Sequence, residues 1–162
     1  MNNDIAKICD LLKTKNIEFT LIEHEAVFTM EEIDELNLPK SKVIAKNLFL
    51  RDDKKRNYYL LVVAKEKTVN LKALKEKIAS RPLSFASEKY LRAKLGLTKG
   101  AVTPFGVIND LEHEVKVFID DNFKDGLVAV HTNANTATVW LRTNSLINFI
   151  KELGNECEFI NI

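Results

Sequence analysis

Lys46 is the first residue whose type and position could do chemistry. It lies in the apolar stretch of residues 43–50, and burying an unpaired ammonium is costly. The lysine therefore either extends along the surface to solvent or faces a polar cavity. Asn47 follows it and would point to the opposite side of a regular strand. The two could face one cleft only if the strand bends or is just beginning there.

A second feature is the segment of residues 96–109, in which Gly100 and Gly106 flank Thr103 and Pro104, with Phe105 next in the chain. The prolyl nitrogen has no hydrogen to donate. Such a segment can present spare backbone N–H groups to an anion or to a carbonyl oxygen. An ordinary turn is the alternative interpretation.

Two histidines follow apolar runs: His131 comes after residues 127–130, and His24 comes after residues 17–22. A histidine where a buried strand emerges is well placed to line a cleft, and a hydrogen bond to the backbone is the alternative. The sequence contains no Walker loop, dinucleotide-binding glycine motif, nucleophile elbow or His/Cys metal cluster. Cys9 and Cys157 lie far apart in the sequence, so we expect buried, reduced thiols.

The pattern of apolar residues predicts the elements that must position these groups. Helices are expected where apolar residues recur at helical spacing or follow capping residues such as Asn70 and Ser87: residues 4–15, 30–37, 71–78, 88–96 and 144–153. Strands are expected in short apolar or alternating runs: residues 17–22, 47–50, 58–63, 115–119, 127–130, 138–141 and 158–160. These elements predict an α/β fold, with a mixed, mainly antiparallel sheet of six or seven strands surrounded by helices.

Composition limits the class of protein. The chain has 162 residues, of which 46% are hydrophobic and 29% charged, and we expect one domain over residues 1–162 with an apolar core. Its longest apolar runs are far shorter than the roughly 20 residues that a membrane span needs. Met1 to Asp4 show no basic stretch followed by an apolar one, so we expect no secretory signal and a cytoplasmic location.

The formal net charge of +1 conceals a strong asymmetry along the chain. Residues 38–100 contain 17 of the 24 Lys and Arg but only 5 of the 23 Asp and Glu, a local excess of 12 positive charges. Such a segment should make one side of the molecule electropositive and attractive to a polyanion such as a nucleic acid. The alternative is that the basic and acidic parts fold against each other and cancel.

Several motifs together resemble a known family. They are residues 24–29 (HEAVFT), residues 43–50 (VIAKNLFL) with residues 58–62 (YYLLV), Gly100 with Pro104 four positions later, and residues 131–133 (HTN). In this order and spacing they resemble the YbaK/prolyl-tRNA-synthetase-associated editing domains over almost the whole chain. Within that superfamily the sequence is most similar to free-standing prolyl-tRNA editing proteins, which remove alanine mischarged onto proline tRNA.

The resemblance implies an aminoacyl-tRNA hydrolase that uses no metal, no cofactor and no covalent nucleophile. The 2′-hydroxyl of the terminal adenosine would help to orient or activate the attacking water. The implied catalytic residues are Lys46, which would hold a phosphate of that adenosine, Gly100, whose amide would bind the ester carbonyl, and His131, which would limit the amino-acid pocket. The implied substrate-binding residues are Asn47, Thr103, Pro104, Phe105, Asn133, His24, Phe28 and Thr29.

The implied substrate and partner is mischarged tRNA(Pro), with prolyl-tRNA synthetase as a candidate partner. A sibling enzyme acting on Cys-tRNA(Pro) or another mischarged tRNA is one alternative. A non-catalytic tRNA-binding or regulatory module is another, and it would bind tRNA with a steep salt dependence but without turnover. The sequence does not determine the volume of the pocket or the oligomeric state.

Overall fold

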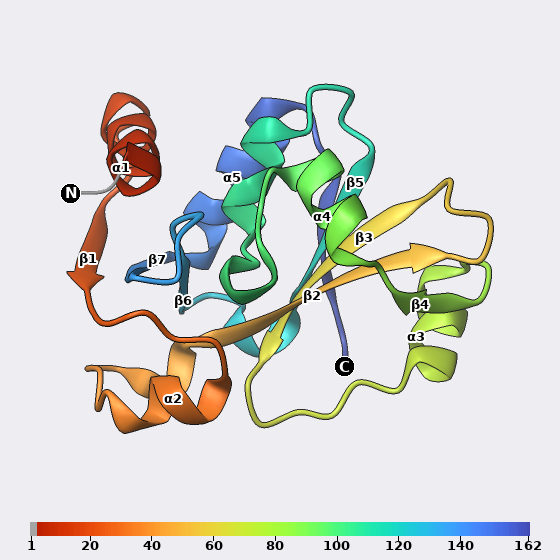
Figure 1. The fold of residues 1–162 in the computed structure, drawn as a ribbon, viewed down its shortest axis with the longest axis horizontal. Coiled ribbons are helices and arrows are strands. Elements are labelled where there is room, and N and C mark those ends of the chain that lie inside the picture. Colours follow the sequence, from red (N-terminus) through yellow and green to blue (C-terminus); the bar gives the residue numbers. More distant parts are fainter. Residues whose placement is uncertain (1–2) are drawn as a thin grey trace.

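A computed structural model describes residues 3–162. Its strands are β1 (Phe19–Glu23), β2 (Ala45–Asp52), β3 (Tyr58–Ala64), β4 (Leu83–Phe85), β5 (Val115–Asp120), β6 (Leu127–His131), β7 (Ala137–Arg142) and β8 (Cys157–Ile160). They form a three-stranded antiparallel sheet in the order β1-β7-β6 and a five-stranded mixed sheet in the order β4-β2-β3-β5-β8 (Figure 1). Among the strand pairs within residues 3–162, β3–β5 and β5–β8 are parallel and the others antiparallel.

Some helices begin or end at capping residues that the sequence marks, such as Asn70 and Gly96. The helices are α1 (Asn3–Thr14), α2 (Met30–Glu35), α3 (Leu71–Ile78), α4 (Glu88–Leu95) and α5 (Thr143–Leu153), with 3-10 turns η1 (Ser41–Val43), η2 (Lys99–Ala101), η3 (Pro104–Asn109) and η4 (Asp121–Phe123). The side chain of Asn70 accepts hydrogen bonds from two amides of α3, as a capping residue does. Gly96 ends α4 with a φ of 65°, a conformation that costs glycine little.

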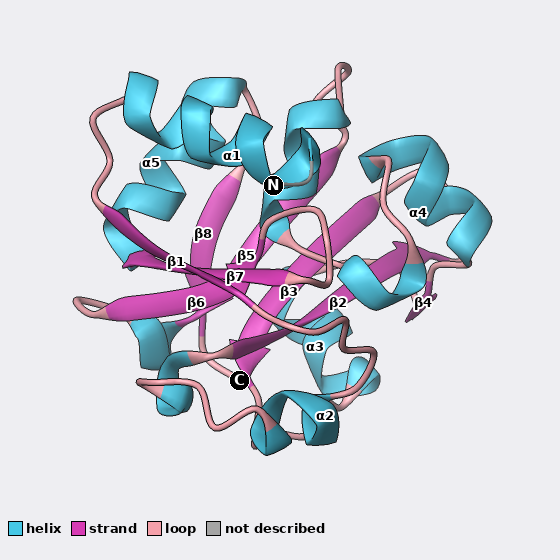
Figure 2. Ribbon diagram, turned by 60° about the vertical axis from the view of Figure 1, so that its left-hand side comes forward, coloured by secondary structure: helices cyan, strands magenta, loops and turns pink. Residues whose placement is uncertain are grey.

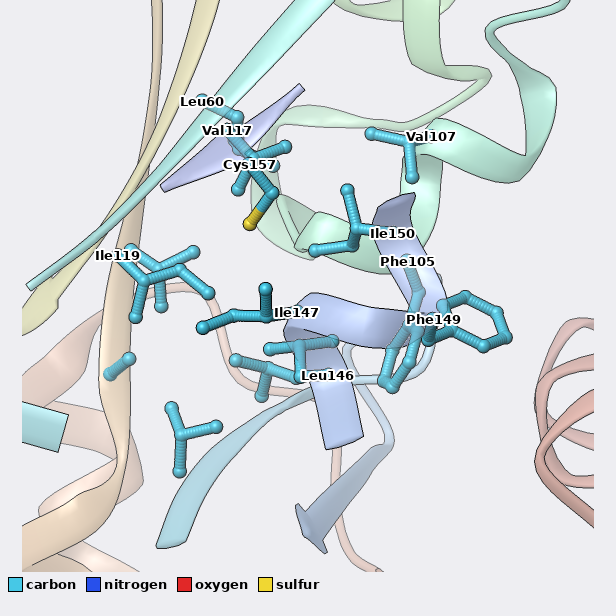
Figure 3. Close-up of a cluster of buried hydrophobic side chains, with 14 of the residues drawn as sticks. Leu60, Phe105, Val107, Val117, Ile119, Leu146, Ile147, Phe149, Ile150 and Cys157 are labelled. Carbon is cyan, nitrogen blue, oxygen red and sulfur yellow. The ribbon is translucent and has the colours of Figure 1, made fainter. Parts of the chain in front are cut away.

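The five-stranded sheet is apolar on both faces, so helices cover it on both sides (Figure 2). Along β3, Leu60 and Val62 belong to the large core beneath α5, whereas Leu61 and Val63 pack toward α3 on the other face. This alternation follows from the two-residue period of a strand. Figure 3 shows the large core, in which Phe149 of α5 packs against Phe105 of η3 and Cys157 of β8 belongs to the same cluster.

A parallel bridge between Ile44 and Ala129 joins the two sheets. It brings the beginning of β2, where Lys46 lies, alongside the end of β6, where His131 lies. Lys46 and His131 are far apart in the sequence and come to the same region because the two sheets are joined here and share the large core.

The predicted α/β class, with mixed and mainly antiparallel strands, is confirmed. The described residues hold eight strands in two sheets rather than six or seven in one, because β1 pairs with β7 far along the chain, which strand patterns cannot show. β4 was not predicted, since three residues after Pro82 are too few to show alternation. The segment 96–109 contains η2 and η3 rather than a simple turn.

Both cysteines are buried free thiols, as expected, and burial raises the pKa of Cys157 to about 12. Met1 and Asn2, part of the segment from which no secretory signal was expected, lie outside the described residues. In the described part of the chain no helix is long and apolar enough to cross a membrane.

Candidate active site

A cavity of about 170 Å³ opens where the two sheets meet. Four segments line it: residues 27–30 with Ile33 before and within α2, residues 45–47 at the beginning of β2, Lys99, Gly100 and Val102 around η2, and His131 at the end of β6. Six of the residues proposed from the sequence share this cavity: Lys46, Asn47, Gly100, His131, Phe28 and Thr29. The structure therefore brings together residues from distant motifs, while their individual roles remain proposals.

Lys46 and Asn47 both line the cavity because it opens at the very beginning of β2, which starts at Ala45. The Lys46 Nζ atom donates a hydrogen bond to the main-chain carbonyl of Lys67. The Asn47 Oδ1 atom is buried and has no hydrogen-bond partner within residues 3–162. A buried, unpartnered amide oxygen is costly unless a ligand or water donates to it. The cavity thus offers a positive charge beside an unused acceptor.

Gly100 lies in η2 against the ring of Phe28. A Cβ atom at this position would lie 2.7 Å from Phe28 Cδ1 and 3.3 Å from Asn135 Nδ2, so a larger residue here would displace the Phe28 ring. The amide of Ala101 already donates to Thr98 O at 3.0 Å. The neighbouring amide of Gly100 is therefore the candidate donor to a substrate carbonyl at this wall.

His131 presents a neutral imidazole to the cavity. Burial lowers its pKa to about 4, against a smaller opposing effect of its hydrogen bond to Ala137. Its Nδ1 atom lies 3.4 Å from the carbonyl oxygen of Ala137, so the neutral ring carries its proton on Nδ1 and leaves Nε2 as an acceptor. The Thr103 hydroxyl donates to the main-chain oxygen of His131 at 2.6 Å and fixes the backbone there.

The other proposed site residues do not line the cavity. Thr103, Pro104 and Phe105 are buried, because the Thr103 hydroxyl caps η3 and turns this segment toward the core. Asn133 contacts this segment, with its Nδ2 atom 3.5 Å from the main-chain oxygen of Phe105. His24 contacts the site indirectly: its ring centroid is 6.2 Å from that of His131, and its Nε2 lies 2.9 Å from Thr138 Oγ1.

Several lining residues were not predicted from the sequence, and Lys99 is the charged one among them. Its position next to Gly100 in the basic segment was the available signal. Larger cavities of about 560 and 590 Å³ are lined by residues of the three-stranded sheet and of the beginning of α5, and none of the proposed site residues lines them. Residues 3–162 contain no cluster of three or more His, Cys, Asp or Glu that could hold a metal ion.

Comparison with known proteins gives a consistent result. Residues 24–149 match the family described as the aminoacyl-tRNA editing domain. The chain is 46% identical over 159 residues to the prolyl-tRNA editing protein ProX of Acetoanaerobium sticklandii, covering 98% of this chain and 94% of that one. It is 35% identical to prolyl-tRNA synthetase associated domain-containing protein 1 of Danio rerio, over 88% of this chain and 79% of the relative.

Among solved structures, the fold resembles a crystal structure described as that of a proposed trans-editing enzyme for prolyl tRNA synthetase. The TM-score is 0.75, with coverage of 100% of this chain and 99% of that chain. At 16% sequence identity, this likeness concerns the fold alone.

Proposed function

The chain belongs to the aminoacyl-tRNA editing domain family, and we propose that it is a deacylase that removes alanine from mischarged tRNA(Pro) in trans. The relative from Acetoanaerobium sticklandii is named a prolyl-tRNA editing protein, which supports tRNA(Pro) as the substrate. The observation that carries the proposal is the single small cavity shared by Lys46, Asn47, Gly100 and His131.

The chemistry of the substrate explains why these groups would suffice. The ester between an amino acid and the terminal ribose is already activated, so the protein must bind it, place a water and stabilise negative charge on the carbonyl oxygen. Attack by water would give a tetrahedral intermediate, whose collapse releases the amino acid and the ribose hydroxyl. The 2′-hydroxyl of the terminal adenosine would orient the water, which removes the need for a side-chain nucleophile.

Each residue of the cavity would then have a distinct role. Lys46 would bind a phosphate of the terminal adenosine as a point charge. The amide of Gly100 would bind the developing oxyanion, and one such donor stabilises a transition state by about 3–4 kcal/mol. The unpartnered Oδ1 of Asn47 would accept a hydrogen bond from the amino group of the aminoacyl ester.

Specificity for alanine would come from the size of the site. A synthetase pocket built for proline rejects a smaller amino acid only weakly, because each missing methylene is worth about 1–3 kcal/mol. A second site with little room can hydrolyse the smaller ester and exclude proline. His131, neutral and held by Ala137 and Thr103, would form the wall that sets this limit.

The deciding experiment compares hydrolysis of labelled Ala-tRNA(Pro), Cys-tRNA(Pro) and Pro-tRNA(Pro) by the purified chain without synthetase. We expect rapid loss of the alanyl ester and little hydrolysis of the prolyl ester. Faster hydrolysis of the cysteinyl ester would replace alanine by cysteine as the substrate. Equal hydrolysis of all three, or none, would exclude the proposal, and binding without turnover would favour a non-catalytic tRNA-binding module. Turnover by the isolated chain would show that prolyl-tRNA synthetase is not required for the reaction.

A further inference from the structure

The ammonium of Lys46 is held by a neutral partner. Its Nζ atom donates to the main-chain carbonyl of Lys67, which lies in the segment between β3 and α3. An ammonium has three donors, so one bond to a carbonyl leaves two of them and the full positive charge for an anionic ligand. The position of this carbonyl therefore determines where the charge of Lys46 lies relative to the cavity.

The segment that supplies the carbonyl is anchored by a buried carboxylate. Lys67 Nζ donates to Asp120 Oδ1 at 2.9 Å and to the main-chain oxygen of Ile162 at 3.2 Å. Asp120 Oδ2 accepts the amide of Ala64 at 3.0 Å, and the amide of Lys67 closes a turn onto Ala64 O at 3.0 Å. Asp120, at the end of β5, thus holds both ends of the turn formed by residues 64–67.

The strength of this anchor follows from burial. Asp120 is 0% exposed, and breaking a buried ion pair is strongly destabilising because it leaves one charge uncompensated. The other lysine of the turn, Lys65, pairs with Asp34, whose side chain is 58% exposed, and ion pairs of that kind contribute little. Of the two lysines, Lys67 is the one whose ion pair fixes the turn.

We propose that Lys67 and Asp120 are positioning residues for Lys46. Their ion pair fixes the turn of residues 64–67, and the Lys67 carbonyl in that turn holds the Lys46 ammonium at the wall of the cavity. The inference rests on the proposed function, in which Lys46 binds a phosphate of the substrate. It adds that the ammonium of Lys46 is placed by the Lys67–Asp120 ion pair, which does not itself touch the substrate.

The test is a double-mutant cycle on the full-length protein. Lys67→Met removes the ion pair and keeps the main-chain carbonyl. We expect it to raise the KM for mischarged tRNA five- to tenfold with a much smaller change in kcat. In a Lys46→Ala background the same substitution should change neither constant by more than twofold, because its effect passes through Lys46. Lys67→Arg, which keeps a cation opposite Asp120, should restore most of the activity.

Lys65→Met is the matched control, since it removes an ion pair from the same turn without contact to Asp120. It should leave KM and kcat unchanged. If Lys67→Met fails to fold, Asp120→Asn, which retains an acceptor for one neighbouring amide, enters the same cycle.

Two results would overturn the inference. One is an equal effect of Lys67→Met in the presence and absence of the Lys46 side chain. The other is a rise in KM for Lys65→Met as large as that for Lys67→Met. Full activity of Lys46→Ala alone would instead remove Lys46 from the proposed function, so the two failures are distinguishable.

Discussion

Lys46 is half-buried, and no carboxylate of the described chain lies within 4.0 Å of its ammonium. Its hydrogen bond goes to a neutral carbonyl, which leaves its positive charge uncompensated and available for a ligand. We expect Lys46→Ala to lower deacylation of Ala-tRNA(Pro) at least tenfold and to leave the melting temperature nearly unchanged.

Lys13→Ala is the control for this prediction, because it removes the same charge from an exposed position outside both the cavity and the basic segment of residues 38–100. Both variants are measured by deacylation and by thermal unfolding. A large drop in the melting temperature of Lys46→Ala would assign this lysine a structural role instead.

The lowered pKa of His131 predicts how the free energy of unfolding depends on pH. The pKa of its imidazole is about 4 in the folded protein and has an ordinary value of 6.5 in the unfolded chain. Between these values the unfolded state binds more protons, so the free energy of unfolding falls as the pH drops from 6.5 toward 4. The contribution of this one group is about 2 kcal/mol, allowing for its partial exposure to solvent.

Chemical denaturation at pH values from 4 to 7 measures this effect. His131→Gln, which keeps a polar side chain without an ionisation, should lose less stability over this range than the wild type, and the difference isolates His131 from the carboxylates. The imidazole resonance that disappears in His131→Gln should titrate near pH 4. A midpoint near 6.5 would show that the ring is more hydrated than the structure indicates.

At the scale of elements, Gly100 in η2 and Gly106 in η3 can be compared by what an added Cβ atom would contact at each. A Cβ at Gly100 meets the ring of Phe28, which is 69% exposed and can turn away. A Cβ at Gly106 lies 2.6 Å from Leu97 Cδ1 and 3.1 Å from Leu95 Cβ, both in the core. Gly100→Ala should therefore lose activity about fivefold or more with little loss of stability, and Gly106→Ala should lose about 1–3 kcal/mol of stability through overpacking.

Denaturant unfolding and deacylation, measured on both variants, compare the two elements directly. If Gly100→Ala keeps full activity, η2 does not supply a group that contacts the substrate. If it unfolds as easily as Gly106→Ala, the Phe28 ring is part of the fold rather than a movable wall of the cavity.

Local patterns were sufficient to predict most elements and insufficient to predict their pairing. Asn70 and Gly96 mark helix ends through hydrogen bonds and backbone conformation within a few residues. The division into two sheets depends on contacts such as that between Ile44 and Ala129, which no local pattern records. β4 has only three residues, too few to alternate visibly.

The sequence motifs predicted the candidate site correctly where a residue of the motif itself reaches the cavity. Lys46, Asn47, Gly100 and His131 reach the cavity directly. Phe105 belongs to the same motif as Gly100, but η3 turns its ring into the core against Phe149. The contribution of Asp120 was hidden because it acts through Lys67, whose carbonyl happens to lie next to Lys46 only in the folded chain.

At the scale of the whole molecule, the basic segment of residues 38–100 keeps most of its charge unneutralised. Six of its 17 basic side chains form ion pairs within residues 3–162: Lys65, Lys67, Lys75, Arg81, Arg92 and Lys94. The other eleven have no carboxylate within 4.0 Å in this part of the chain. Three of these pairs join the segment to acidic residues outside it, so the basic and acidic parts cancel only in small part through direct contacts, which favours a polyanionic ligand.

If these free cations bind the tRNA backbone, the affinity must depend steeply on salt. Each phosphate contact releases counterions and contributes about 0.7–0.9 to the slope of log K against log salt concentration. We expect KM for Ala-tRNA(Pro) to rise steeply between low and physiological salt, whereas hydrolysis of alanyl-adenosine, which has no phosphate, should show almost no salt dependence. The comparison separates long-range attraction from the chemistry in the cavity, because both substrates carry the same ester. Equal salt dependence for the two would mean that salt acts on the protein itself, and the basic segment would then have no part in binding tRNA.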